Sequence, residues 1–145
     1  MVLILAASGC QLDPYSSHYA RSKPDPSWLI GKWQATPETL KQLASPGSPT
    51  SNPVLKIRAD GSIGMFDIPS PWLSDVGKGG GHAKRIDERW EPEHHQGRWW
   101  GLTLRDPFWD CSGCLMILGN DAPYRLVLRY GDPDKGLGYE FEKRE

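Results

Sequence analysis

The chain has 145 residues and a formal net charge of −1. This length is enough for one domain with a core of its own, and the near-neutral balance gives no indication of nucleic-acid or anionic-membrane binding. No stretch of about 18 apolar residues is present, so the sequence predicts no membrane-spanning helix. Abundant glycine and proline, together with seven tryptophans, are typical of short strands joined by turns around an aromatic core.

The N-terminus has an apolar run, residues 2–7, followed by Ser8, Gly9 and Cys10. Small residues before a cysteine resemble the lipobox of bacterial lipoproteins, in which the cysteine is acylated and becomes the first residue of the mature chain. No Lys or Arg precedes the run, and the run is short, as in a signal peptide that begins further upstream. We therefore interpret residues 1–10 as a partial signal peptide with Cys10 as the lipidation site. The alternative is a frayed terminus with an ordinary cysteine.

Residues 11–27 are polar and show no periodicity, so they are predicted to form a flexible tether between the anchor and a β-barrel domain at residues 28–145. The expected partner of the anchor is a lipid bilayer, and the expected location is the periplasm-facing cell envelope. The resemblance to lipoproteins implies the outer membrane rather than the inner one in a Gram-negative cell, because the residue after Cys10 is Gln11 and not Asp.

The first predicted elements are a strand at residues 28–34 and a short helix at residues 36–43 that Thr36 can cap. Gly31 and Trp33 in the strand form a G-x-W motif. This motif resembles the one that opens the first strand of lipocalins, where the tryptophan plugs one end of the barrel. An aromatic residue in an edge strand is an equal alternative.

The clearest signal is a β-hairpin in which Leu55, Ile57, Ile63 and Met65 alternate with polar residues. A three-residue loop at residues 59–61 pairs Ile57 with Ile63 and Leu55 with Met65, so that the apolar residues share one face. A two-residue loop would put the apolar residues of the second strand on the charged face. The pattern therefore predicts the longer loop, with its glycine left-handed in a bulge.

The same register places Val54 and Phe66 on the opposite face, where they need a cover such as Trp72. Trp72 also belongs, with Phe108 and Trp109, to a group of loop aromatic residues that would rim a pocket or a protein-binding patch, because aromatic residues are enriched at such sites. The alternative is that these residues plug the core.

Five further strands are predicted, at residues 84–91, 99–105, 115–118, 124–130 and 139–143. Short sequential strands with turn signals between them indicate an all-β, mainly antiparallel fold. We predict a lipocalin-like meander barrel of seven to eight strands with one short helix near the N-terminus, since closure leaves no exposed sheet edge.

Cys111 and Cys114 form a C-x-x-C pair. Exported thiols usually pair, so we predict a structural disulfide between them; the alternative, a redox pair, would need an activating helix N-terminus that the flanking sequence does not supply. His82, His94 and His95 could complete a zinc site with these cysteines, but adjacent histidines on a strand point to opposite faces. Residues 92–97 are better interpreted as a polar hairpin loop, and neither a metal nor a cofactor is predicted.

Beyond the lipobox, the chain resembles a group of small uncharacterised bacterial lipoproteins that share G-x-W, L-x-L-x-x-D-G-S/T and G-D-P-D-x-G…F-x-K patterns. The resemblance implies a β-rich, lipocalin-like fold and no established activity. The residues that match are Gly31, Trp33, Leu55, Ile57, Asp60, Gly61, Ser62, Pro69, Gly97, Trp99, Gly131, Asp132, Pro133, Asp134, Gly136, Phe141 and Lys143, with Leu102 and Leu104 at a shifted spacing.

No frame of nucleophile, base and oxyanion donors is present, so no catalytic residue and no enzyme activity are predicted. The sequence favours a membrane-anchored, non-enzymatic binding module for a small apolar ligand or a protein partner. The alternative is a periplasmic immunity or inhibitor protein that acts on a toxin or hydrolase. A closed apolar cavity would favour the first interpretation, and a solid core with exposed aromatic loops would favour the second.

Overall fold

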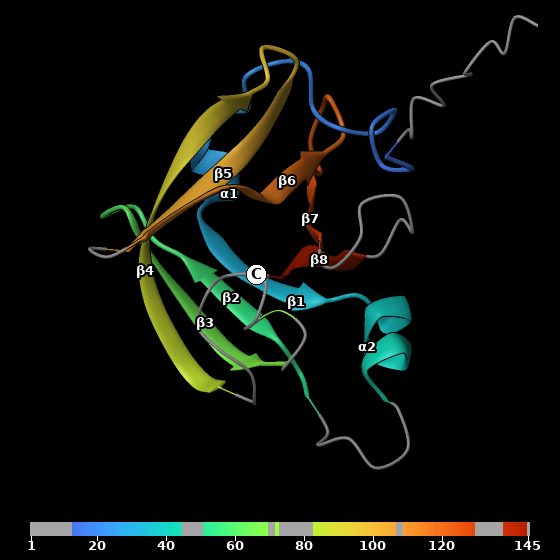
Figure 1. Cartoon of the computed structure of the whole chain (residues 1–145), viewed down its shortest axis with the longest axis vertical. Coiled ribbons are helices and arrows are strands. Elements are labelled where there is room, and N and C mark those ends of the chain that lie inside the picture. Colours follow the sequence, from blue (N-terminus) through green and yellow to red (C-terminus); the bar gives the residue numbers. More distant parts are fainter. Residues whose placement is uncertain are drawn as a thin grey trace, which may run out of the picture.

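The eight strands form a closed antiparallel barrel in which neighbours in the sequence are neighbours in the sheet and β8 pairs with β1 (Figure 1). The computed structural model describes residues 13–44, 51–69, 72, 83–106, 109–129 and 138–144, without the side chains of residues 106 and 109–114. The elements are α1 (Pro26–Leu29), β1 (Gly31–Ala35), α2 (Pro37–Leu43), β2 (Val54–Ile57), β3 (Ser62–Ile68), β4 (Ala83–His95), β5 (Trp99–Asp106), β6 (Trp109–Leu118), β7 (Arg125–Arg129) and β8 (Gly138–Arg144). The predicted all-β meander barrel is confirmed.

The β2–β3 hairpin has the predicted register. Ile57 pairs with Ile63 and Leu55 pairs with Met65, and all four side chains are buried. Gly61 has a φ of +82°, which is the left-handed conformation expected at the end of the three-residue loop. Alternation of apolar residues and one glycine were therefore enough to fix both strands and their turn.

The predicted cover of the outer face by Trp72 is wrong. Trp72 is only 1% exposed and packs in the core of the barrel. Burial there removes the large apolar surface of its indole ring from water. Phe66 is covered by cations from neighbouring strands instead. Lys56 Nζ lies 5.2 Å from the centroid of the Phe66 ring, and Arg85 Cζ lies 5.6 Å from it.

The predicted first strand begins later than expected, because residues 28–29 belong to the short helix α1. Asp25 caps this helix through a hydrogen bond from a backbone amide, and Pro26 occupies its first position. Trp33 of β1 is buried, and its Nε1–H donates to the Leu29 carbonyl at 2.8 Å. The second helix, α2, begins and ends close to the predicted bounds.

Residues 92–97 are not the loop that the sequence predicts, because β4 continues to His95. The turn is confined to the next three residues, and Gln96 and Gly97 have φ values of 51° and 65°, as a type I′ turn requires. Pro92 is tolerated in the strand because β3 pairs with β4 only as far as Arg89. Beyond that residue the missing amide of the proline faces no neighbouring strand.

One hydrophobic cluster fills the described part of the barrel and includes Trp33, Trp72 and Phe141, all at most 1% exposed. A second, smaller cluster lies outside the sheet, where Tyr19 packs on Val127 and its neighbours. Val127 alternates along β7 with the core residues Leu126 and Leu128 and therefore points outward, yet it is buried. A further segment of the chain must therefore cover that part of the barrel.

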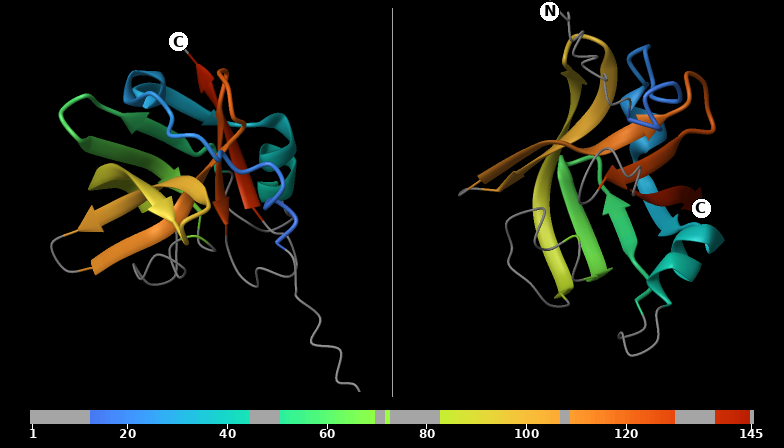
Figure 2. Two further views of the ribbon diagram at one scale, coloured as in Figure 1. Left: turned by 90° about the horizontal axis from the view of Figure 1, so that it is seen from above. Right: turned by 45° about the vertical axis from the view of Figure 1, so that its right-hand side comes forward.

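The covering segment is residues 13–25, here called the N-terminal strap, which runs along the outside of the barrel beside β6 and β7 (Figure 2). Ala20 is fully buried; its amide donates to the Ile117 carbonyl, and its carbonyl accepts from the Trp100 amide, both at 2.8 Å. The predicted tether is described from residue 13 on, and this part packs against the barrel rather than extending freely.

Candidate functional site

The predicted rim of aromatic residues is not brought together in the described part of the chain. Trp72 is a core residue, which is the alternative that the sequence left open for it. Phe108 and the side chain of Trp109 lie outside the described residues, as does Cys10. The lipidation of Cys10 and the roles of Phe108 and Trp109 stay predictions.

The two cysteines of the C-x-x-C pair both lie on β6, and their side chains are outside the described residues. The backbone register is informative nonetheless. Leu104 pairs with Cys111 and Leu102 pairs with Leu115, so residues 112–114 lie opposite a single residue of β5. In a regular strand, two residues three positions apart are about 10 Å apart, which is too far for a disulfide. A bulge brings the residues on either side of it closer together than that. The disulfide remains a prediction.

The candidate metal site that includes the histidines lies only partly within the described residues. His82 lies outside the described residues, and His94 stacks on Trp100 with ring centroids 4.9 Å apart and an interplanar angle of 16°. In the part of the chain that the structure describes, no group of three or more His, Cys, Asp or Glu residues could hold a metal ion.

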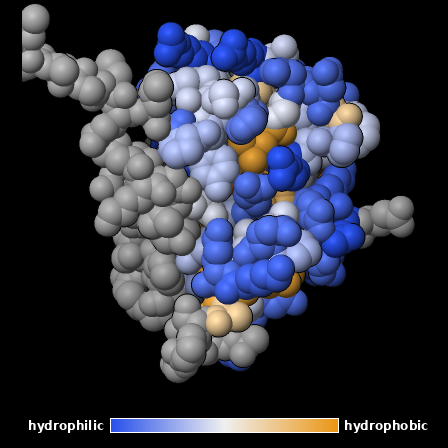
Figure 3. Space-filling model, turned by 90° about the vertical axis from the view of Figure 1, so that its right-hand side faces the viewer, coloured by the Kyte–Doolittle hydropathy of each residue, from blue (hydrophilic) through white to orange (hydrophobic). Residues whose placement is uncertain are grey.

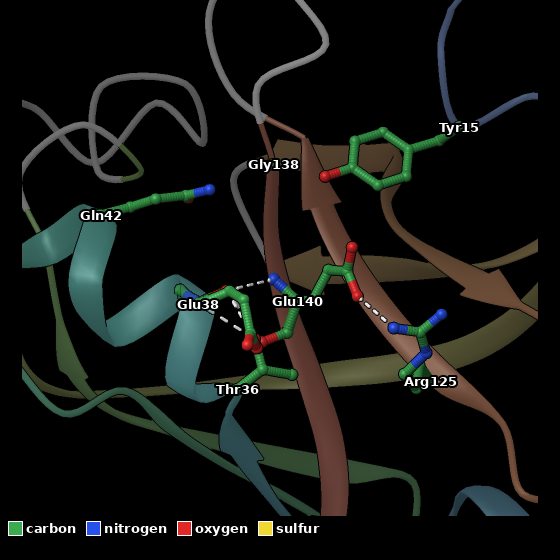
Figure 4. Close-up of a pocket in the computed structure, with 8 residues that line it drawn as sticks. Tyr15, Thr36, Glu38, Gln42, Arg125, Gly138 and Glu140 are labelled. Carbon is green, nitrogen blue, oxygen red and sulfur yellow. Dashed lines mark hydrogen bonds and ion pairs between the residues drawn. The ribbon is translucent and has the colours of Figure 1, made fainter.

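Two polar pockets lie on the outside of the barrel, and both are lined by Arg125. The first pocket has a volume of about 170 Å³ and lies between the strap, α2 and β7–β8 (Figure 4). The second has a volume of about 280 Å³ and lies between the strap and the β6–β7 turn. The face that carries α2 is largely hydrophilic (Figure 3). The residues that line the first pocket are Tyr15, Thr36, Glu38, Thr39, Gln42, Arg125, Gly138 and Glu140. Those that line the second pocket are Ser17, His18, Leu118, Gly119, Asn120, Pro123 and Arg125.

The first pocket is built by the start of α2 clamped onto β8. The Thr36 amide donates to the Glu140 carbonyl at 2.9 Å, and Thr39 Oγ1 accepts from the Glu140 amide at 2.8 Å. Thr36 Oγ1 also caps α2 by accepting from the Thr39 amide. Both threonine hydroxyls therefore hold the helix in place.

Charged side chains enter the first pocket from opposite walls. Arg125 Nη1 lies 2.7 Å from Glu140 Oε2, and the two side chains are 55% and 25% exposed. Glu38 lies on the α2 wall, and Tyr15 approaches from the strap, as Figure 4 shows. This ion pair is largely open to solvent, so it adds little to stability but leaves donors and acceptors available to a ligand.

The second pocket is held by the strap as well. The Gly119 amide donates to the His18 carbonyl at 2.9 Å, and the Arg21 amide donates to Asn120 Oδ1 at 2.9 Å. These bonds fix the β6–β7 turn against the strap, so both pockets depend on the strap being in place.

A partly buried polar cluster attaches the strap to the barrel. Asp13 Oδ2 accepts from the Tyr19 hydroxyl at 2.6 Å and from Arg129 Nη1 at 2.5 Å, and Asp13 Oδ1 accepts from the Tyr15 amide at 3.0 Å. Burial alone would raise the pKa of Asp13, but these hydrogen bonds outweigh burial and hold the pKa below its ordinary value of 3.8. Burial and the hydrogen bond to Asp13 raise the pKa of Tyr19, so its hydroxyl stays protonated as a donor.

The fold and these pockets define a closed β-barrel with polar recesses on its outer surface. Comparison with protein-family models, with curated proteins and with solved structures found no match to this chain. Within the described ranges, no helix has the length and apolar character needed to cross a membrane.

Reasoning from the sequence missed the pocket residues. Arg125 has its partner, Glu140, 15 positions away in the sequence, and only the β7–β8 pairing brings the two together. The one local signal was the Asp13–Pro14 dipeptide, which is typical of an ordered turn rather than a free tether.

Proposed function

We propose that the protein is a non-enzymatic binding module that is held at a cell-envelope membrane by an acylated Cys10 and recognises its ligand on the outer surface of the barrel. The observation that carries the second part is the pair of polar pockets that share Arg125. In the part of the chain that the structure describes, the interior is packed by side chains that include Trp33 and Trp72, and both described pockets lie outside it.

The strap supports a short connection to the membrane. Cys10 precedes Asp13 by three positions, and three extended residues span at most about 11 Å. Asp13 is itself bonded to Arg129 of β7. An acyl group on Cys10 would therefore hold the strap side of the barrel next to the bilayer, rather than at the end of a long tether.

A second function, inhibition of or immunity to a toxin or hydrolase, is favoured by the packed core of the described residues. Recognition groups on the outside of a barrel, such as those of the two described pockets, suit a protein partner better than an enclosed small molecule. The inhibitor role and the binding-module role differ in the identity of the ligand, and both include the acylated Cys10 as membrane anchor.

The anchor is tested by detergent-phase partitioning of the full chain expressed in the cell from which its gene comes. We expect the wild-type protein in the detergent phase and the membrane fraction, and Cys10→Ser in the aqueous phase. Cys111→Ser is the matched control, because it removes a cysteine without removing the lipidation site. Wild-type protein in the aqueous phase would contradict the proposal.

A further inference from the structure

The outer face of β1–β4 carries a concentration of positive charge that the net charge of the chain conceals. Outward positions of β1–β3 and of the part of β4 that pairs with β3 hold four cations and one carboxylate, Asp87, and a fifth cation, Arg58, follows the end of β2. Two more carboxylates, Glu91 and Glu93, occupy outward positions further along β4, where it pairs with β5. We call the surface of the five cations the cationic face. They are Lys32, Lys56, Arg58, Arg85 and Arg89, and Lys56 and Arg85 contact the Phe66 ring.

Most cations of this face make no direct ion pair. Arg85 is engaged by Asp87, with Nε 2.7 Å from Oδ2 and Nη2 3.2 Å from Oδ1. In the described part of the chain the other four make no ion pair within 4.0 Å. Asp60 of the nearby turn accepts from the Ser62 hydroxyl at 2.6 Å, and it also attracts Arg89 and Arg58 and partly balances their charge. The Arg85–Asp87 pair shows that this surface accepts a carboxylate in the two-pronged geometry that guanidinium favours.

The charges are arranged at a cost to the sheet. Lys32 lies directly opposite Lys56 on one side and opposite Arg144 on the other, so three cations form a row across β8, β1 and β2. Like charges directly opposite each other destabilise a sheet. A row of this kind is not expected of a face that serves only to keep the protein in solution, where mixed signs are favoured.

Phe66 and Gly64 keep the cations in place. A Cβ on Gly64 would lie 3.0 Å from the Phe66 ring and 3.1 Å from Arg58 Nη2, so the glycine lets both side chains lie flat on the sheet. Lys56 and Arg85 then contact the same ring through cation–π interactions. The ring supports cations and is covered by them, so it is not a stacking platform of the kind that nucleic-acid bases require.

The position of the face bears on what can reach it. In a ring of eight strands, β2 and β3 lie across the barrel from β6 and β7, where the strap is bound (Figure 1). If the anchor of the proposed function holds the strap side near the bilayer, the cationic face points away from that membrane. Anionic headgroups of the anchoring bilayer are then out of reach, and a partner in the aqueous compartment is not.

We propose that the cationic face binds an acidic segment of a protein partner, with Asp and Glu carboxylates received by Lys56, Arg58 and Arg89 beside Phe66. Aromatic and arginine side chains are typical of the energetically dominant part of protein interfaces. The choice of a soluble partner over the anchoring membrane rests on the proposed function. The expectation that the face binds carboxylates does not rest on it, because it follows from the cations themselves.

The test uses the full chain with Cys10→Ser, so that anchoring has no part in the measurement. Fluorescence anisotropy with a labelled polyglutamate peptide of about 20 residues is expected to give salt-sensitive binding that Lys56→Gln with Arg89→Gln weakens about tenfold or more. Lys41→Gln is the matched control, an exposed cation on α2 that lines neither pocket, and is expected to leave the affinity unchanged. The melting temperature of the double variant should be equal to or above that of the parent, because a like-charge row has been broken.

Four results would overturn the proposal: no binding of the peptide at low salt, equal weakening by Lys41→Gln, tighter binding of phosphatidylglycerol vesicles through the same residues, or tighter binding of a single-stranded DNA oligonucleotide. A failure of anchoring leaves all four measurements unaffected, because it is read from detergent partitioning of the wild-type protein alone.

Discussion

Replacement of Tyr19 tests whether the strap is part of the folded domain. The side chain is 1% exposed, packs against Met116, Leu118 and Val127, and meets Trp99 edge to face with centroids 5.5 Å apart. Loss of a buried aromatic ring to alanine costs about 3–5 kcal/mol, so Tyr19→Ala should lower the free energy of unfolding by that amount.

The hydroxyl can be separated from the ring with Tyr19→Phe. Asp13 would lose the bond from the Tyr19 hydroxyl but would keep those from Arg129 and from the Tyr15 amide. We expect a loss of about 1–2 kcal/mol, typical of one hydrogen bond to a charged and partly buried group.

Both values are measured by urea unfolding at neutral pH, with the midpoint compared at constant slope. His18→Ala is the control, because this exposed neighbour on the strap should change stability by less than about 0.5 kcal/mol. If Tyr19→Ala changes the midpoint no more than His18→Ala does, the strap contributes no packing and the reasoning is refuted.

Three further predictions concern the core, the sheet and the acid limit. Trp72→Ala should lower the free energy of unfolding in urea by about 3–5 kcal/mol. Trp28 is 46% exposed, so Trp28→Ala should lower it by less than about 1 kcal/mol. Equal losses for the two variants would contradict the placement of Trp72 in the core. Gly101→Ala should cost about 1–3 kcal/mol, because its Cβ would lie 2.7 Å from the Leu115 carbonyl oxygen; an unchanged midpoint contradicts this contact. Asp13 has a lowered pKa, so its contribution is present above pH 3.8 and is lost as pH falls through the lower folded value; Asp13→Asn should flatten that loss in an acid titration.

Much of the fold could be predicted because its signals are local. The alternation from Leu55 to Met65 and the left-handed Gly61 determined the hairpin register, and Thr36 determined the start of α2. A polar strand such as β4 gives a weaker signal. Its end at His95 is set by pairing with β5 rather than by its own pattern, so the sequence placed a loop there.

The parts that could not be predicted depend on residues far apart in the sequence. Tyr19 is buried because Val127 and Met116 lie beneath it, and nothing in the polar composition of residues 11–27 reveals that contact. The pockets arise in the same way, where α2, the strap and β7–β8 meet. The bulge at residues 112–114 likewise appears only in the register of β5 with β6.

The bulge gives the C-x-x-C pair a testable consequence. Closing so small a ring by a disulfide would contribute about 2 kcal/mol on the chain-entropy estimate. Thiol titration of the exported, unfolded protein should find Cys111 and Cys114 unreactive until a reductant is added. Two reactive thiols before reduction would exclude the disulfide.

The account depends most on the claim that an acylated Cys10 holds the barrel at a membrane. Mass spectrometry of the protein purified from the membranes of its own cell tests this claim directly. The account predicts that the mature chain begins at Cys10 and that its N-terminal peptide carries the added mass of a diacylglyceryl group. A mature chain that retains residues before Cys10, or an N-terminal peptide with an unmodified thiol, would contradict it.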